Sequence, residues 1–330
     1  MTEIWNTFLV HPLINLLVGA YGLLADFGLA IVLVTVGIRL ILYPLFVTQI
    51  RSQRAMQEVA PALAELKAKH GKDRQRMGEE QMKLYRERGV NPAMGCLPLL
   101  LQMPILFGFY AAMLQMTYGL GGGFGGELAP LTGAQFETIR YPFIPNPLAP
   151  GDALDLTARW LPWLPGGLGN TDPLYILPVL AGVTQLIASL MAQPAVQPKN
   201  LEPQAKMMQS MVYYFPIITV VIAIGLPAGL AVYWVATTVF QIVQQYFVTG
   251  WGQLTRWIPA LRAIPTPADR SMARRESAAI AEVERDMAGD GAHGGTDDDT
   301  TASDTAESGA EGRDEGRDDG RRRGRRRRRR

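Results

Sequence analysis

Long apolar stretches alternate with polar ones over the first 250 residues, and this pattern predicts helices that cross a lipid bilayer. A helix needs about 20 residues to span the roughly 30 Å hydrocarbon core. Five stretches reach or approach that length, at residues 28–47, 94–118, 174–192, 212–226 and 229–248. The fourth is short for a bilayer, and a tight turn at residues 225–229 separates it from the fifth. The expected fold class is an all-α polytopic membrane protein with five transmembrane helices, a helical hairpin and a disordered tail.

The first 27 residues hold a further apolar stretch with a different pattern. Thr7, His11 and Asn15 fall near one helical face, while the leucines lie elsewhere. This arrangement favours a helix that lies in the membrane interface. An additional span over residues 8–25 stays open as the alternative. The N-terminus has neither the basic residues of a secretory signal nor the composition of a transit peptide, so we expect the mature chain to begin at Met1.

Three polar segments connect or follow the predicted spans. Residues 48–93 are rich in Gln, Ala, Glu and Lys, and they predict a two-helix hairpin with Gly71 at its turn and Asp73 as the cap of the second helix. Residues 119–173 form a long loop, whose glycines at 121–126 are typical of a flexible linker. Residues 251–330 form a charged, largely disordered tail that ends in Arg321–Arg330.

Charge is distributed unevenly among these segments. The chain holds 32 Lys+Arg and 30 Asp+Glu, but 17 of the basic and 16 of the acidic residues follow Gly250. Residues 48–93 carry ten basic residues, whereas residues 119–173 carry two. Because basic loops stay in the cytoplasm, we expect the hairpin and the C-terminus inside, and the N-terminus and residues 119–173 outside.

Cofactor and covalent chemistry are not indicated. The single Cys96 excludes an intramolecular disulfide, and three scattered histidines offer no metal-binding cluster. The sequence also lacks a Ser/His/Asp or Cys/His arrangement for nucleophilic catalysis. We therefore expect no cofactor, no metal and no enzymatic reaction.

Arg39 is the most unusual residue of the predicted spans. It lies near the middle of residues 28–47, where an arginine costs roughly 2.5–3.5 kcal/mol to insert. None of the five spans contains Asp, Glu or Lys, so a salt bridge inside the membrane is excluded. Snorkelling toward the inner headgroups is the structural alternative.

Uncharged polar residues in the other spans favour a water-filled cavity around Arg39. Each alone is more typical of a helix–helix hydrogen bond, but together with an unpaired arginine they predict a wet, positively charged cavity. They are Gln102, Gln115, Thr184, Gln185, Thr237, Thr238, Gln241, Gln244 and Gln245.

Three motifs resemble those of a known family. The YidC/Oxa/Alb insertases have a specific signature that resembles the segment GVNPAMGCLPLLLQMPI, from Gly89 to Ile105. Their first core span resembles Gly28–Ile31 with Arg39 and Tyr43–Leu45. Their closing hairpin resembles Leu226–Leu230 followed by Tyr233-Trp234. The similarity covers about residues 10–250 in the same order.

The resemblance implies a membrane protein insertase, a chaperone without covalent chemistry. Such a protein receives hydrophobic nascent segments in a hydrophilic, positively charged groove and releases them laterally into the bilayer. Arg39 matches the groove arginine, which attracts acidic outer segments of incoming proteins. Thr35, Gln185 and Trp234 match groove-lining positions, and Gln102 is expected to join them. For Trp234, a place in the aromatic belt of the membrane is the alternative.

The resemblance also implies a location and partners. The chain lacks the large outer domain of Gram-negative members and a lipoprotein cysteine, and a bacterial plasma membrane is expected. The expected partners are nascent membrane proteins, the lipid bilayer, a Sec-type translocon and, through the basic end Arg321–Arg330, the ribosome; specific DNA is not expected.

Two other functions stay open at the level of the sequence. The first is a small-anion transporter or channel that uses the Arg39 cavity. The second is a membrane scaffold whose tail recruits ribosomes or RNA. The lack of intramembrane carboxylates and of an inverted repeat argues against the transporter.

Overall fold

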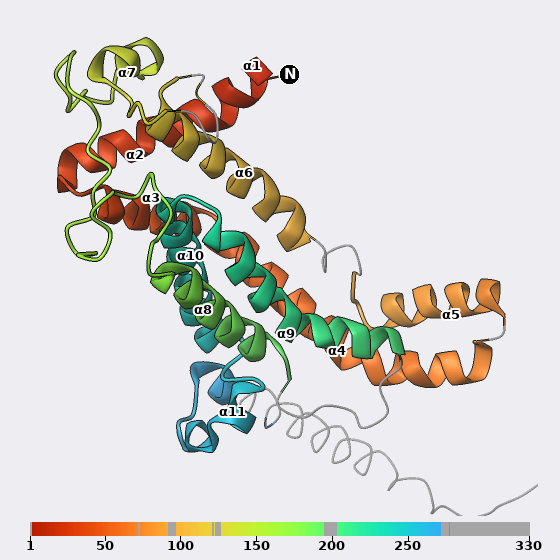
Figure 1. Ribbon diagram of the computed structural model, residues 1–330. Coiled ribbons are helices and arrows are strands. Elements are labelled where there is room, and N and C mark those ends of the chain that lie inside the picture. The colour runs from red at the N-terminus through yellow and green to blue at the C-terminus, as the bar shows by residue number, and fades with distance from the viewer. Residues whose placement is uncertain are drawn as a thin grey trace, which may run out of the picture. The chain divides into compact units, whose positions relative to one another are not determined.

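The computed structural model describes residues 2–71, 73–91, 97–120, 122, 127–194, 203–271 and 277, and these are largely helical (Figure 1). The chain divides into two compact units, residues 1–277 and 278–330, and all described residues belong to the first. Part of the family-like signature (residues 92–96), most of the predicted glycine linker and the basic end Arg321–Arg330 lie outside the described residues.

The N-terminal residues form three consecutive helical pieces, α1 (Thr2–Trp5), the π-helical η1 (Asn6–Val10) and α2 (His11–Leu24). α2 packs on the next helix and on α6, and it buries Leu13, Ile14 and Leu17. Asn15, from the predicted polar face, is 1% exposed. Its side chain donates to the carbonyls of His11 and Ile139 and accepts a hydrogen bond from the amide of Tyr141. The polar face at this position therefore ties α2 to the segment that follows α6.

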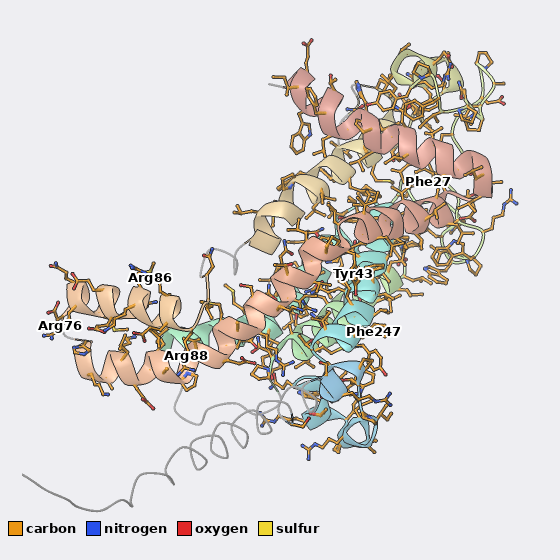
Figure 2. The ribbon with its side chains drawn as sticks, turned by 180° about the vertical axis from the view of Figure 1, so that it is seen from behind. Phe27, Tyr43, Arg76, Arg86, Arg88 and Phe247 are labelled. Atoms are coloured by element: carbon orange, nitrogen blue, oxygen red, sulfur yellow. The ribbon has the colours of Figure 1, made fainter. Side chains whose placement is uncertain are left out.

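The single helix expected over residues 28–47 is divided in two. α3 (Phe27–Ile41) begins after Asp26, which caps it by accepting a hydrogen bond from the amide of Leu29. The chain then bends by 69° into α4 (Tyr43–His70), and Figure 2 labels the first residue of each helix. Pro44 explains the break, because it has no N–H to donate and its ring clashes with the carbonyl of the residue four positions earlier, Leu40. The hairpin helix expected from residue 48 thus begins at Tyr43.

α4 and α5 (Arg74–Glu87) form the helical hairpin. The side chain of Asp73 caps α5, as expected, by accepting a hydrogen bond from the amide of Arg76. Gly89 follows α5 with a φ of +62°, a conformation that favours glycine. Figure 2 shows Arg76, Arg86 and Arg88 on this hairpin.

Four further long helices belong to the body of the molecule. They are α6 (Leu97–Tyr118), α8 (Ile176–Ala192), α9 (Pro203–Ile224) and α10 (Ala228–Val248). α10 packs on α3, α4, α6, α8 and α9, so it is the central helix. α9 begins before the apolar stretch that was expected to start at residue 212.

The long segment between α6 and α8 is packed onto the helices. It contains α7 (Gly133–Ile139), which a Thr132–Gln135 capping box begins. Leu131, Phe136 and Leu168 from this segment are fully buried in the main hydrophobic core. Asp26 also accepts hydrogen bonds from the amide of Arg159 and the indole of Trp160, so the same carboxylate caps α3 and holds the segment.

The packed body continues past the expected boundary at Gly250. Residues 251–271 include α11 (Leu254–Trp257) and the 3₁₀-helix η3 (Pro259–Ala263). Leu254 joins Leu190 of α8 and Val212 of α9 in a second hydrophobic cluster. The first part of the predicted tail is therefore folded.

Length and composition single out residues Glu3–Leu24 as a helix able to cross a membrane, within the described residues. α3 and α4 pass the same test only when the bent pair is taken together. α8 and the Ser210–Ile224 part of α9 are apolar but shorter. The number of spans, five or six, therefore stays a prediction.

Candidate functional site

A cavity of about 630 Å³ lies among the ends of α3 and α4 and the helices α6, α8, α9 and α10. Its wall has a polar part and an apolar part, and among the described residues that line it none is acidic. The amide, hydroxyl and guanidinium groups come from Arg39, Gln49, Gln53, Gln102, Tyr110, Gln185, Tyr233, Thr237, Thr238, Gln241 and Gln244. The apolar part includes Phe46, Ile50, Met103, Leu106, Phe107, Phe215, Ile222, Leu226 and Leu230.

Arg39 lies at the end of α3 with only 6% of its surface exposed. The central carbon of its guanidinium is 4.2 Å from the centre of the Phe46 ring, which is a cation–π contact. Phe46 follows Arg39 by two helical turns, and the bend at Leu42 lies between them. The break in the helix therefore folds the ring over the charge.

Gln102 connects Arg39 to α10. Its side-chain oxygen accepts a hydrogen bond of 3.5 Å from Nη2 of Arg39, and its nitrogen donates one of 2.8 Å to the Tyr233 hydroxyl. Tyr233 is buried, and its ring stacks on Phe109 at a centroid distance of 4.3 Å. Because Tyr233 is fixed by this stacking, the Gln102 amide is held with its oxygen toward Arg39.

Several cavity amides have hydrogen-bonding capacity that the protein does not use. Gln49 and Gln244 are each 2% exposed. The nitrogen of Gln49 and both polar atoms of Gln244 are buried without a hydrogen-bond partner within the described part of the chain. Buried polar groups are costly unless they are paired, so these atoms suit a cavity that holds water or a polar chain.

The structure brings together four of the five predicted site residues. Arg39, Gln102, Gln185 and Trp234 all line the cavity. Thr35 does not: it is 2% exposed, and its hydroxyl donates to the carbonyl of Ile31 one turn earlier. A buried threonine can satisfy its hydroxyl on its own helix, which is why one shared helical face did not place Thr35 at the cavity wall.

The wider polar set divides in the same way. Thr237, Thr238, Gln241 and Gln244 line the cavity. Three others lie outside its wall, where Thr184 accepts a hydrogen bond from Thr238, Gln115 donates to Asn6, and Gln245 is buried. Thr184 and Gln115 therefore form hydrogen bonds between helices, which was the alternative to a place in the cavity wall.

Sequence reasoning missed the contribution of α4. Phe46, Gln49, Ile50 and Gln53 line the cavity, although Gln49, Ile50 and Gln53 fall in the segment that was predicted to be a polar two-helix hairpin. Their spacing of three, four and seven residues places them on one helical face. That spacing in the sequence could have indicated that α4 contributes one face to the cavity. The break at Pro44, which starts α4 early, turns this face toward Arg39.

The described residues form a helical fold around a cavity that holds a buried arginine and several amides. Known proteins are similar to this chain in sequence. Residues 19–253 match the family described as 60Kd inner membrane protein. A membrane protein insertase YidC of Alkalihalophilus pseudofirmus is 36% identical over 252 residues, which cover 74% of this chain and 81% of that protein. The membrane protein insertase MisCA of Bacillus subtilis is 35% identical over 251 residues, 74% of this chain and 79% of that protein. A solved structure of an active YidC insertase, with its first transmembrane domain resolved, is 25% identical, with a TM-score of 0.41, over 72% of this chain and 45% of that one.

The chain belongs to this family, that of the YidC membrane protein insertases. The resemblance carried by the three sequence motifs is thereby confirmed.

Proposed function

We propose that the protein is a membrane protein insertase that receives nascent segments in the Arg39 cavity and releases them laterally into the bilayer. The observation that carries this proposal is a buried arginine in a cavity lined by amides and free of acidic residues among the described ones. The names of its relatives support the same activity.

The electrostatics of the cavity suit an acidic incoming segment. Two opposite charges 4 Å apart attract by about 1 kcal/mol in water and by about 4 kcal/mol at the effective dielectric near a protein surface. Arg39 is held by an aromatic ring and an amide, both uncharged, so its charge is not neutralised by these contacts. A carboxylate of a substrate would supply the counter-charge.

The two parts of the wall suit the two parts of a substrate. Unsatisfied amides such as those of Gln49 and Gln244 offer hydrogen bonds to the polar backbone of a segment that must cross the membrane. Without such partners, backbone groups in hydrocarbon cost several kcal/mol each. The apolar wall contains residues of α6 and α9, and the outer face of α9 is exposed at Tyr214, Ile217 and Val221. A hydrophobic helix would pass along this side into lipid.

We further propose the orientation and the setting that the charges favour. The protein lies in a bacterial plasma membrane, with the α4–α5 hairpin and the C-terminus in the cytoplasm and the N-terminus outside. Five helices span the bilayer and α2 lies in its interface. Its partners are nascent membrane proteins, a Sec-type translocon and, through Arg321–Arg330, the ribosome.

Reconstitution in liposomes tests the proposal. The substrate is a short single-span protein with an acidic outer segment. The readout is protection of that segment from added protease once it has crossed the vesicle membrane. Wild type is expected to raise insertion well above protein-free liposomes, and Arg39→Ala is expected to lose most of that gain. The matched control is Arg51→Ala, an exposed arginine on α4 that does not line the cavity.

Three outcomes would contradict parts of the proposal. Insertion equal to that of empty liposomes would refute the insertase function. Arg39-dependent uptake of a small anion such as chloride into the same vesicles, without insertion, would instead establish the anion transporter. Equal insertion by wild type and Arg39→Ala would remove the role of the arginine while leaving the activity.

A further inference from the structure

A second cavity, of about 540 Å³, lies at the opposite end of α10 from the Pro227 turn. Its walls come from α4, from the end of α8, and from the folded segment 251–271. This cavity is separate from the Arg39 cavity, because the two share no lining residue.

The wall carries two arginines, one from each side. Arg54 of α4 is anchored by a hydrogen bond to the carbonyl of Thr249 and by an ion pair with Glu58 at 3.4 Å. Arg262 of η3 is exposed. Asp269 also lines the cavity, but its carboxylate accepts two hydrogen bonds from Thr266.

Uncharged polar groups complete the wall. Gln57, Gln193 and Thr255 line the cavity. The side-chain oxygen of Gln57 is buried and accepts no hydrogen bond in the part of the chain that the structure describes. An anionic group with polar, hydroxyl-bearing neighbours would fit these residues, since it pairs with arginine and can donate to the Gln57 oxygen.

The segment that forms one wall of this cavity also carries exposed apolar side chains. Trp257, Ile258 and Ile264 of segment 251–271 are 59%, 48% and 50% exposed, and Phe247 at the end of α10 is 54% exposed (Figure 2). Exposed tryptophan and isoleucine side chains beside an arginine-bearing cavity are typical of a segment that lies in the headgroup region of a membrane.

We propose that segment 251–271 rests on the inner membrane leaflet and that the second cavity binds the headgroup of an anionic phospholipid such as phosphatidylglycerol. The phosphate lies between Arg54 and Arg262, and the glycerol hydroxyls reach Gln57. Trp257, Ile258 and Ile264 insert beside the acyl chains. A lipid is favoured over a soluble anion because Ile264 lines the cavity and the same segment exposes Trp257 and Ile258. The proposal rests on the proposed orientation, in which the end of α10 is cytoplasmic.

Lipid retention on the full-length protein tests the proposal without any insertion assay. The purified protein in detergent is titrated with phosphatidylglycerol or phosphatidylcholine, and bound lipid is counted by native mass spectrometry. Wild type is expected to retain phosphatidylglycerol about tenfold more strongly. Arg262→Gln is expected to reduce that preference at least threefold, and the matched control Arg256→Gln, which alters an exposed arginine outside the cavity wall, is expected to preserve it.

Three results would overturn the lipid site. One is equal retention of the two lipids by wild type. Another is an equal loss with Arg256→Gln and Arg262→Gln, which would indicate diffuse attraction to the surface. The third is displacement of the bound lipid by millimolar inorganic phosphate, which would indicate a site for the free ion. Because no substrate is present, these results are independent of whether the protein inserts membrane proteins.

Discussion

Arg39 combines a full charge with near-complete burial, and the structure shows how its neighbours tolerate it. A ring lies over the guanidinium and an amide oxygen accepts from it, but no carboxylate lines its cavity among the described residues. Because no carboxylate is paired with it, the guanidinium charge is stabilised less than it would be in an ion pair. It can therefore still attract an incoming anion. The Gln102 amide is important in this respect, because Tyr233 holds it in one orientation.

Gln102→Leu is expected to lower Arg39-dependent insertion by roughly twofold to twelvefold, the effect of losing one hydrogen bond of about 0.5–1.5 kcal/mol. Insertion of the acidic single-span substrate into liposomes measures it. Gln115→Leu is the matched control, because Gln115 lies on the same helix but donates to Asn6 and not into the cavity. Equal losses in the two variants would show that Gln102 acts through the general stability of α6.

At the scale of elements, two local departures from regular structure build the two cavities. Pro44 breaks the helix after Arg39 and turns the Phe46–Gln53 face of α4 toward the arginine. Gly252 allows the chain to leave α10 and fold back, with a φ of +50°. At both positions, a segment with many polar residues packs against the apolar helices of the body.

Gly252→Ala is expected to loosen the folded segment 251–271. An added Cβ would lie 2.3 Å from the carbonyl oxygen of Met191 and 2.5 Å from that of Gln193, and the positive φ disfavours any residue with a Cβ. The loss should be about 1–3 kcal/mol, seen as a lower Tm and as faster proteolysis after Trp257. Gly78→Ala on α5 is the control, because nothing lies within 4 Å of its added Cβ. An unchanged Tm for Gly252→Ala would contradict the close packing at this turn.

The segment that contains α7 is expected to loosen in acid. Glu137 accepts two hydrogen bonds from Arg140 and one from Asn146, and the pairing with Arg140 lowers the pKa of Glu137 below its ordinary value. The stabilisation is therefore complete above the ordinary pKa of about 4.3 and is lost as the pH falls through the lowered value. Hydrogen exchange of residues 133–146, corrected for the intrinsic pH dependence, should rise below about pH 4. Glu137→Gln should abolish that rise, and a rise of equal size in this variant would exclude the carboxylate as its cause.

At the scale of the whole molecule, the packed body extends past Gly250 and includes residues 251–271. Leu254 is buried against α8 and α9, so the residues just after α10 belong to the fold. The proposed roles of the C-terminal region therefore separate. In the proposal, residues 251–271 stabilise the body and contact lipid, and the arginines at 321–330 contact the ribosome.

Two truncations test this separation. A chain that ends at Ser271 should keep the Tm of the full-length protein and lose most ribosome co-sedimentation at low salt, because it lacks the basic end. A chain that ends at Gly250 should lose co-sedimentation and also unfold at a lower temperature, since the Leu254 contacts are removed. Full co-sedimentation of the Ser271 truncation would exclude the basic end as the ribosome contact.

The sequence alone indicated the family of the protein and the buried arginine around which its cavity is built. Apolar length predicted the helices, the lack of carboxylates in the spans made Arg39 conspicuous, and three motifs indicated the family. These features are local, because a helix period or a motif can be read over a few residues.

Only the tertiary structure decided which polar residues share a cavity. It excluded Thr35, which bonds its own helix, and it added Phe46, Gln49, Gln53 and Tyr233. It also folded residues 251–271 against α8 and α9. The physical reason is that the bend at Pro44 and the packing around α10 set the directions in which side chains point. Those directions depend on contacts between residues far apart in the chain.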